Sequence, residues 1–113
     1  MGEFIVEDIK WKKGEEGIQK IILLESDGTS LRDLTGKTYN FKFWKRGSGI
    51  LEGGGSVAIA NPPGTDGELD YTVLTTDTDA INNFIGEIIE EPGGAELRSE
   101  TFKVLVEESS DFT

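Results

Sequence analysis

The segment Lys37–Arg46 constrains the fold more than any other part of this sequence. Tyr39, Phe41 and Phe43 alternate there with polar residues. Successive side chains of an extended strand point to opposite faces, so these three aromatic rings share one face. A period of two residues that uses aromatic and β-branched side chains is typical of a half-buried strand. The segment therefore predicts a β-sheet with one face against a core.

Similar segments recur along the chain, separated by turn residues that include many of the 15 glycines. Short strands that alternate with turns in this way are typical of two packed antiparallel sheets. We therefore expect an all-β fold, an immunoglobulin-like β-sandwich of about seven antiparallel strands in two sheets. One short helical turn is expected near 77–83, because Thr and Asp side chains there can cap a helix start. The expected strands cover residues 4–11, 18–25, 37–46, 50–60, 69–75, 84–88 and 97–106.

A chain of 113 residues is expected to form one domain. Residues 1–12 are predicted to be an N-terminal strand or arm that could contact another subunit. Residues 13–107 would form the sandwich domain. Residues 108–113 are polar and are expected to form a flexible C-terminal tail.

The residue types that are missing limit the chemistry. The sequence contains no cysteine and no histidine. Disulfides, thiolate metal sites and the Ser-His and Cys-His nucleophile systems are therefore excluded. Histidine is also the usual general base near neutral pH. We expect no enzymatic activity, no catalytic residues, no cofactor and no metal.

Carboxylates are the remaining candidates for acid and base catalysis, which needs two such groups with separated pKa values. The candidate pairs are Glu87 with Glu90 or Glu91, and Asp66 with Asp70. In a sequence with 22 acidic residues such pairs arise without selection. A solvated acidic surface is the favoured interpretation, and a carboxylate-based hydrolase that uses Glu87 or Asp70 ranks last among the functional alternatives.

Two further patterns have structural interpretations that we favour over ligand sites. Asp66, Asp70, Asp77 and Asp79 flank one predicted strand, and Ca²⁺ prefers such oxygen ligands. Asp66 and Asp77 would lie about 30 Å apart at opposite strand ends, which favours turn capping over a joint calcium site. The run Gly53–Gly55 lacks the Lys and Ser/Thr of a phosphate-binding loop, and a bulge or bend is favoured there.

Charge and hydropathy argue against nucleic acid and membrane as partners. With 11 basic and 22 acidic residues the net charge is −11, which repels a nucleic acid duplex. The longest aliphatic run, Ile21–Leu24, is far shorter than the ~20 apolar residues of a membrane-spanning helix. The N-terminal residues lack the pattern of a signal peptide, so none is expected.

Four side chains are candidates for contacts with a partner. Trp44 lies on the strand face opposite the aromatic core residues, so it is either a partly exposed contact or a core residue displaced by a bulge. Trp11 is a similar candidate. Phe4 and Val6 lie in an N-terminal strand that could add to the sheet edge of another subunit through main-chain hydrogen bonds.

Three motifs in this order carry a family resemblance. Asp27-Gly28-Thr29 precedes Leu34-Thr35-Gly36-Lys37-Thr38, which leads directly into the aromatic strand. A turn that ends in Asp66-Gly67 leads into Leu69-Asp70-Tyr71-Thr72-Val73, and Phe84-Ile85-Gly86-Glu87-Ile88 precedes the last strand. The arrangement resembles the immunoglobulin-like domain of tailed-phage and prophage structural proteins, especially the N-terminal domain of the baseplate upper protein family. The resemblance covers roughly residues 13–107.

That resemblance implies an assembly adapter in a phage tail or baseplate. Its partners would be other phage tail or baseplate proteins, and it would form a homo-oligomer in the virion after synthesis in the host cytoplasm. The alternative is a cell-surface adhesion or carbohydrate-binding β-sandwich module, in which Trp44 would stack on a sugar.

Overall fold

The computed structural model describes residues 4–48, 51–91 and 97–108. This part of the chain is all-β and contains no helix, which confirms the all-β part of the predicted fold class. No helix in it is long and apolar enough to cross a membrane. Its nine strands are β1 Ile5–Val6, β2 Ile9–Lys12, β3 Gly17–Leu24, β4 Thr38–Lys45, β5 Leu51–Ile59, β6 Glu68–Val73, β7 Asn82–Glu91, β8 Leu97–Arg98 and β9 Phe102–Glu107.

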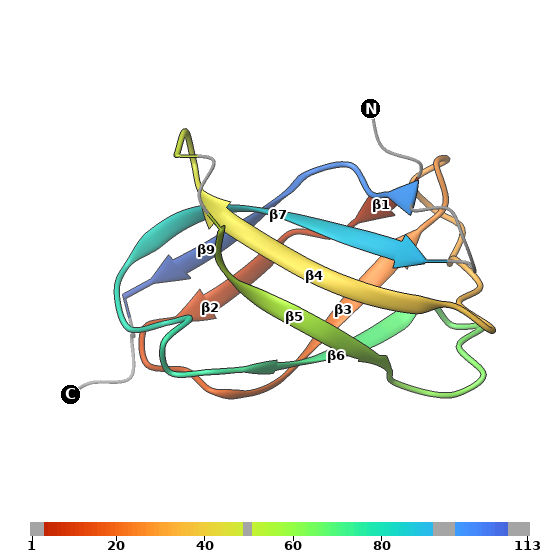
Figure 1. The fold of residues 1–113 in the computed structure, drawn as a ribbon, viewed down its shortest axis with the longest axis horizontal. Coiled ribbons are helices and arrows are strands. Elements are labelled where there is room, and N and C mark those ends of the chain that lie inside the picture. The colour runs from red at the N-terminus through yellow and green to blue at the C-terminus, as the bar shows by residue number, and fades with distance from the viewer. Residues whose placement is uncertain (1–3, 49–50, 92–96, 109–113) are drawn as a thin grey trace.

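The strands form one continuous sheet in the order β1-β3-β6-β5-β4-β7-β9-β2, with β8 paired to β7. β5 connects the two halves because its first part pairs with β4, whereas Ala58 and Ile59 pair with β6. The sheet curls, so that β4 and β5 lie in front of β3 in Figure 1. Its pairing is mixed, because β2 runs parallel to β9, whereas the sequence predicted antiparallel strands only.

The halves of the curled sheet enclose an aromatic core. Tyr39, Phe41 and Phe43 are all buried, which confirms that alternation places them on one inner face. The ring of Phe41 packs edge-on against Tyr71 of the opposite half, with 4.9 Å between the ring centroids. Trp11 packs between Phe43 and Tyr71 and is fully buried. Its indole N–H donates to Oε1 of Gln19 at 3.0 Å, so the buried donor is satisfied.

The N-terminal residues are part of this core. β1 pairs with β3, and β2 pairs with β9. Phe4 and Trp11 have no exposed surface, and Val6 is buried. The described part of the 1–12 segment is therefore a component of the sheet. Of the two predicted alternatives, a strand or an arm, the described residues form strands, and pairing within the chain's own sheet buries the apolar side chains that an arm would have presented.

Two local predictions have different outcomes. A bulge is present, but it precedes the predicted position. Gly53–Gly55 pair with β4 in regular register, and the register shifts between Phe43 and Trp44, whose partners are Gly53 and Leu51. The helical turn near 77–83 is wrong. The N–H of Asp77 donates to the carbonyl of Leu74 at 2.9 Å in an isolated turn, and β7 already begins at Asn82. Of the predicted tail at 108–113, only Glu108 lies within the described residues.

Candidate functional site

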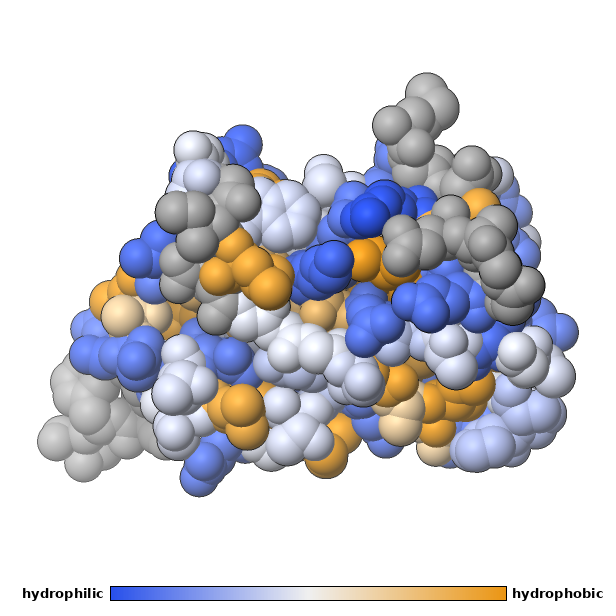
Figure 2. Space-filling model, in the orientation of Figure 1, coloured by the Kyte–Doolittle hydropathy of each residue, from blue (hydrophilic) through white to orange (hydrophobic). Residues whose placement is uncertain are grey.

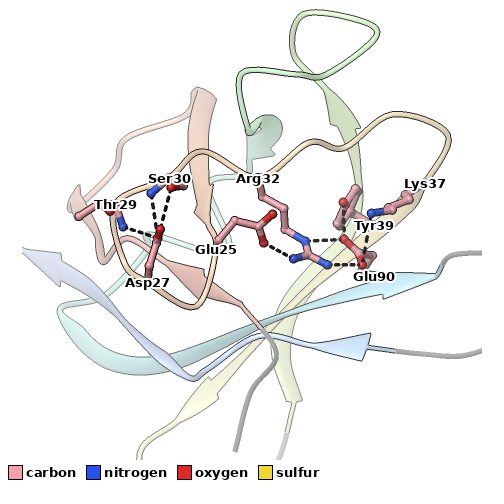
Figure 3. Close-up of polar contacts among 8 residues, drawn as sticks. All are labelled: Glu25, Asp27, Thr29, Ser30, Arg32, Lys37, Tyr39 and Glu90. Atoms are coloured by element: carbon pink, nitrogen blue, oxygen red, sulfur yellow. Dashed lines mark hydrogen bonds and ion pairs between the residues drawn. The ribbon is translucent and has the colours of Figure 1, made fainter.

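The most concentrated group of charged side chains surrounds the carboxylate of Glu90 on β7 (Figure 3). This side chain has no exposed surface. Arg32 donates from Nε to Oε1 at 2.9 Å and from Nη2 to Oε2 at 2.8 Å, and the hydroxyl of Tyr39 donates to Oε1 at 2.6 Å. Lys37 Nζ lies 4.0 Å from Oε2. Arg32 also donates from Nη1 to Glu25 at 2.6 Å.

Alternation explains how Glu90 enters the core. The side chain of Glu90 lies on the same inner face as that of its register partner Tyr39. The residues directly before and after it in β7 point to the outer face. Arg32 reaches it from the loop between β3 and β4, and its guanidinium also lies 4.6 Å from the centre of the Phe4 ring. One arginine therefore links this loop to β7 and to the segment before β1.

These contacts fix the charges of the cluster. Burial alone would raise the pKa of Glu90, but the hydrogen bonds from Arg32 and Tyr39 outweigh it and hold that pKa below its ordinary value. The hydrogen bond to Glu90 raises the pKa of Arg32. Burial, and then the bond to Glu90, raise the pKa of Tyr39. All three groups therefore hold their ordinary charge state at neutral pH, which suits a structural ion pair and does not suit proton transfer.

Asp27 forms a second local cluster at the β3–β4 turn (Figure 3). Its Oδ1 accepts the N–H groups of Thr29 and Ser30, both at 2.9 Å, and its Oδ2 accepts the Ser30 hydroxyl at 2.7 Å. The hydrogen bonds from Ser30, and then from Thr29, lower the pKa of Asp27 to about 2. This is the turn chemistry of an Asx motif, and it shapes the loop that delivers Arg32.

The structure separates the carboxylates that sequence proximity had paired. Glu87 and Glu91 share the outer face of β7, whereas Glu90 lies on the inner face. Glu87 accepts from Arg98 at 2.8 Å. The sequence could have shown that Glu87 and Glu90 do not form a pair, because residues three apart on a strand point to opposite faces. Glu87 and Glu90 therefore lie on opposite sides of the sheet.

The aspartates of the suggested calcium site have separate roles. Asp66 accepts from the Asn61 amide at 2.8 Å, and Asp70 pairs with Lys20 at 3.2 Å. Asp77 is buried and accepts the Tyr71 hydroxyl at 2.7 Å. Over residues 4–48, 51–91 and 97–108, no group of three or more acidic side chains is arranged to hold a metal ion.

The solvent face of the sheet half formed by β4, β7, β9 and β2 has a different composition. Trp44 is partly exposed there, with Leu51 of β5 as its neighbour on one side and Ile85 of β7 on the other. Lys103 of β9 follows Ile85 in the same row. Leu51 is 59% exposed. We call this surface the Trp44 face.

Basic side chains gather on the Trp44 face. Their strand registers place five of the chain's 11 Lys and Arg residues on it, against three acidic residues of the described strands, Glu87, Glu91 and Glu107. A fourth acidic residue, Asp8, lies just before β2 and accepts the backbone N–H of Lys103 at 2.9 Å. Within the described residues, two ion pairs join the two groups, Lys12 with Glu107 and Arg98 with Glu87. Five basic against four acidic groups leave a small positive excess among the described residues of this face, on a chain whose net charge is −11. The five basic residues are Lys10, Lys12, Lys42, Arg98 and Lys103.

The apolar residues do not form one continuous patch. Figure 2 looks onto the side where β4 and β5 lie nearest the viewer, and hydrophilic groups separate its orange areas.

Of the four predicted contact residues, only Trp44 reaches the surface. Phe4, Val6 and Trp11 are buried in the chain's own core, so their side chains offer no contact in this structure. The gathering of lysines was not found from the sequence, where they are far apart. β2, β4 and β9 each have a lysine at an outward position, but the order in which the strands lie side by side depends on the whole fold.

Comparisons with models of known protein families and with curated proteins give no match.

Proposed function

We propose that this chain is a non-enzymatic assembly module that binds other proteins through the Trp44 face. The observation that carries the proposal is the coincidence of a partly exposed tryptophan with a net positive surface on an otherwise acidic chain. Tryptophan is enriched among residues that dominate binding energy, and charge complementarity gives association its orientation and specificity.

The described acidic clusters support a role without catalysis. Glu90, Asp27 and Asp77 all accept hydrogen bonds from groups of the chain itself. In the part of the chain that the structure describes, no buried side-chain N or O atom lacks a hydrogen-bond partner. These carboxylates therefore act as structural acceptors that stabilise loops and turns.

We further propose that the fold is an immunoglobulin-like sandwich. In such a domain one layer has the strand order A-B-E-D and the other has C-F-G. The order β1-β3-β6-β5 supports the first layer and β4-β7-β9 supports the second. β5 would be the strand that crosses between them.

Together with the three turn motifs, this strand order supports the proposal that the chain is a tail or baseplate component of a phage or prophage. In that setting it would be made in the host cytoplasm and incorporated into the virion as an adapter. The Trp44 face would provide its contact with neighbouring tail or baseplate proteins.

Binding to purified tail and baseplate proteins encoded beside this gene tests the proposal. We expect the double variant Trp44→Ala/Lys103→Glu to lose binding by more than about tenfold, because both side chains lie in the central row of the face. The control variant Lys13→Glu changes the net charge by the same amount as the double variant does, but at an exposed residue outside the face. It should bind like the parent chain. Equal binding by both variants would refute the role of the face.

A carbohydrate-binding module is the second candidate. The observation that favours it is that Trp44 lies on an open sheet surface beside Lys42 and Leu51, where its ring could stack on a sugar. A glycan array separates the two functions. Glycan binding that disappears in Trp44→Ala, without binding to any tail protein, would favour this second function.

A further inference from the structure

The opposite side of the curled sheet carries a second apolar surface. Ile5 of β1 and Leu24 of β3 are register partners, and Leu24 also forms a bridge with Leu31. Residues paired in this way point to the same side of a sheet. Ile22 lies two residues before Leu24 on the same side of β3 and is partly exposed. Leu31 is 53% exposed. We call this surface the Ile22 face.

The charges around the Ile22 face are opposite in sign to those of the Trp44 face. Glu68 and Asp70 of β6 point outward there, next to Ile22 and Lys20 respectively. Lys20 lies 3.8 Å from Glu68 and 3.2 Å from Asp70, so one lysine is shared by two carboxylates. Glu7 follows β1 and is exposed. The strands of this face thus carry an excess of acidic groups.

These two faces point away from the core on opposite halves of the sheet. The Cα extents of the molecule are 45 × 30 × 24 Å, and the view down the shortest axis shows β4 and β5 in front of β3 (Figure 1). Two molecules could dock broad side to broad side.

From this complementarity we propose that the partner of the Trp44 face is the Ile22 face of a second copy of this chain. The inference rests on the proposed binding role of the Trp44 face and names its occupant. Trp44, Leu51 and Ile85 would pack against the aliphatic side chains, while Lys42 and Lys103 approach the acidic rim. Neither lysine forms an ion pair with a residue that the structure describes.

Such a contact is heterologous, because each copy uses two different surfaces. Every bound pair leaves one face of each kind free, so the assembly continues into a ring or a filament. The net charge of −11 opposes association at long range. At physiological ionic strength, charges are screened over about 8 Å, so the local pairs decide the orientation.

Sedimentation velocity over a range of concentrations, in buffer at physiological ionic strength, is the first test. The parent chain is expected to form species larger than dimers. Trp44→Ala/Lys103→Glu should break the first face and Leu31→Ala/Asp70→Lys the second. Each variant alone should be monomeric, with association weakened by more than about tenfold. Lys13→Glu should assemble like the parent, and circular dichroism checks that all variants remain folded.

Mixing the two face variants is the decisive experiment. Each retains the face that the other has lost, so the mixture should form a 1:1 complex and stop there. Homodimers of the Leu31→Ala/Asp70→Lys variant would instead show that Trp44 faces bind one another, which would overturn the inference. A parent chain that stays monomeric at all concentrations would overturn it too. If that monomer still binds a tail protein through Trp44, the proposed function stands without this inference.

Discussion

Replacing Arg32 by methionine is expected to destabilise the protein more than any other single change to an ion pair. The side chain of Arg32 is 12% exposed and that of Glu90 is not exposed. Without Arg32, the Glu90 carboxylate would keep only the Tyr39 hydroxyl at 2.6 Å and Lys37 at 4.0 Å. Leaving a buried charge without its partner costs about 3–5 kcal/mol.

Two smaller losses add to this cost. Glu25 is 44% exposed, so its bond to Arg32 contributes at most about 1 kcal/mol. The cation–π contact with Phe4 contributes about 0.5–1 kcal/mol. Methionine retains part of the apolar packing of the arginine stem. We therefore expect a decrease of about 4 kcal/mol in the free energy of unfolding, a large part of the 5–15 kcal/mol of a typical domain.

Urea unfolding followed by tryptophan fluorescence measures this change. The matched control is the double variant Arg32→Met/Glu90→Met, in which the unpaired buried charge is removed as well. Apolar replacement of both partners is often neutral or stabilising, so the double variant should be more stable than Arg32→Met alone. A loss below about 1 kcal/mol in Arg32→Met, or no recovery in the double variant, would refute the assignment of a buried pair.

Three further predictions follow from single residues. The pKa of Glu90 is lower in the folded state, so its contribution to stability is present above the unfolded pKa of about 4.3 and is lost as pH falls through the folded pKa. Acid titration of Glu90→Gln should therefore show a smaller decrease in stability below that pH than the parent chain shows. Gly54→Ala should lower the free energy of unfolding by more than about 3 kcal/mol in urea unfolding, because its Cβ would lie 2.0 Å from the Phe41 carbonyl oxygen. Gly55→Ala, whose Cβ meets nothing within 4 Å, should lower it clearly less. Equal losses in the two variants would contradict the steric reason. Acrylamide should quench the fluorescence of Trp44 and leave that of Trp11 largely unquenched, because Trp11 is buried. The quenched component should be absent from Trp44→Phe.

What the sequence predicted correctly depends on alternation within single strands. The inward side chains of β4 follow from a period of two residues, which needs no knowledge of neighbouring strands. That the glycine run adjoins a bulge likewise follows from local chemistry, although the register shift itself precedes Gly53. Such features depend on residues next to one another in the chain.

The wrong or missing predictions depend on contacts between distant residues. Trp11 was a candidate for exposure because its strand position alone does not tell which element covers it. In the structure it pairs with Val106 in a parallel ladder and packs on Tyr71. The pair formed by Arg32 and Glu90 spans 58 residues. Asp77 was expected to cap a helix, but a buried tyrosine hydroxyl offers it a partner from β6.

The same reasoning explains why the Trp44 face could not be predicted from the overall charge. Strand pairing places Lys10 beside Leu105 and Lys42 beside Glu87, although these partners lie far apart in the chain. Outward positions on adjacent strands thereby become one surface whose sign can differ from that of the whole molecule. A net charge of −11 governs repulsion at distances beyond the screening length, whereas docking is decided by groups a few ångströms apart. An acidic chain can therefore present a basic contact surface, and only the strand order determines where that surface lies.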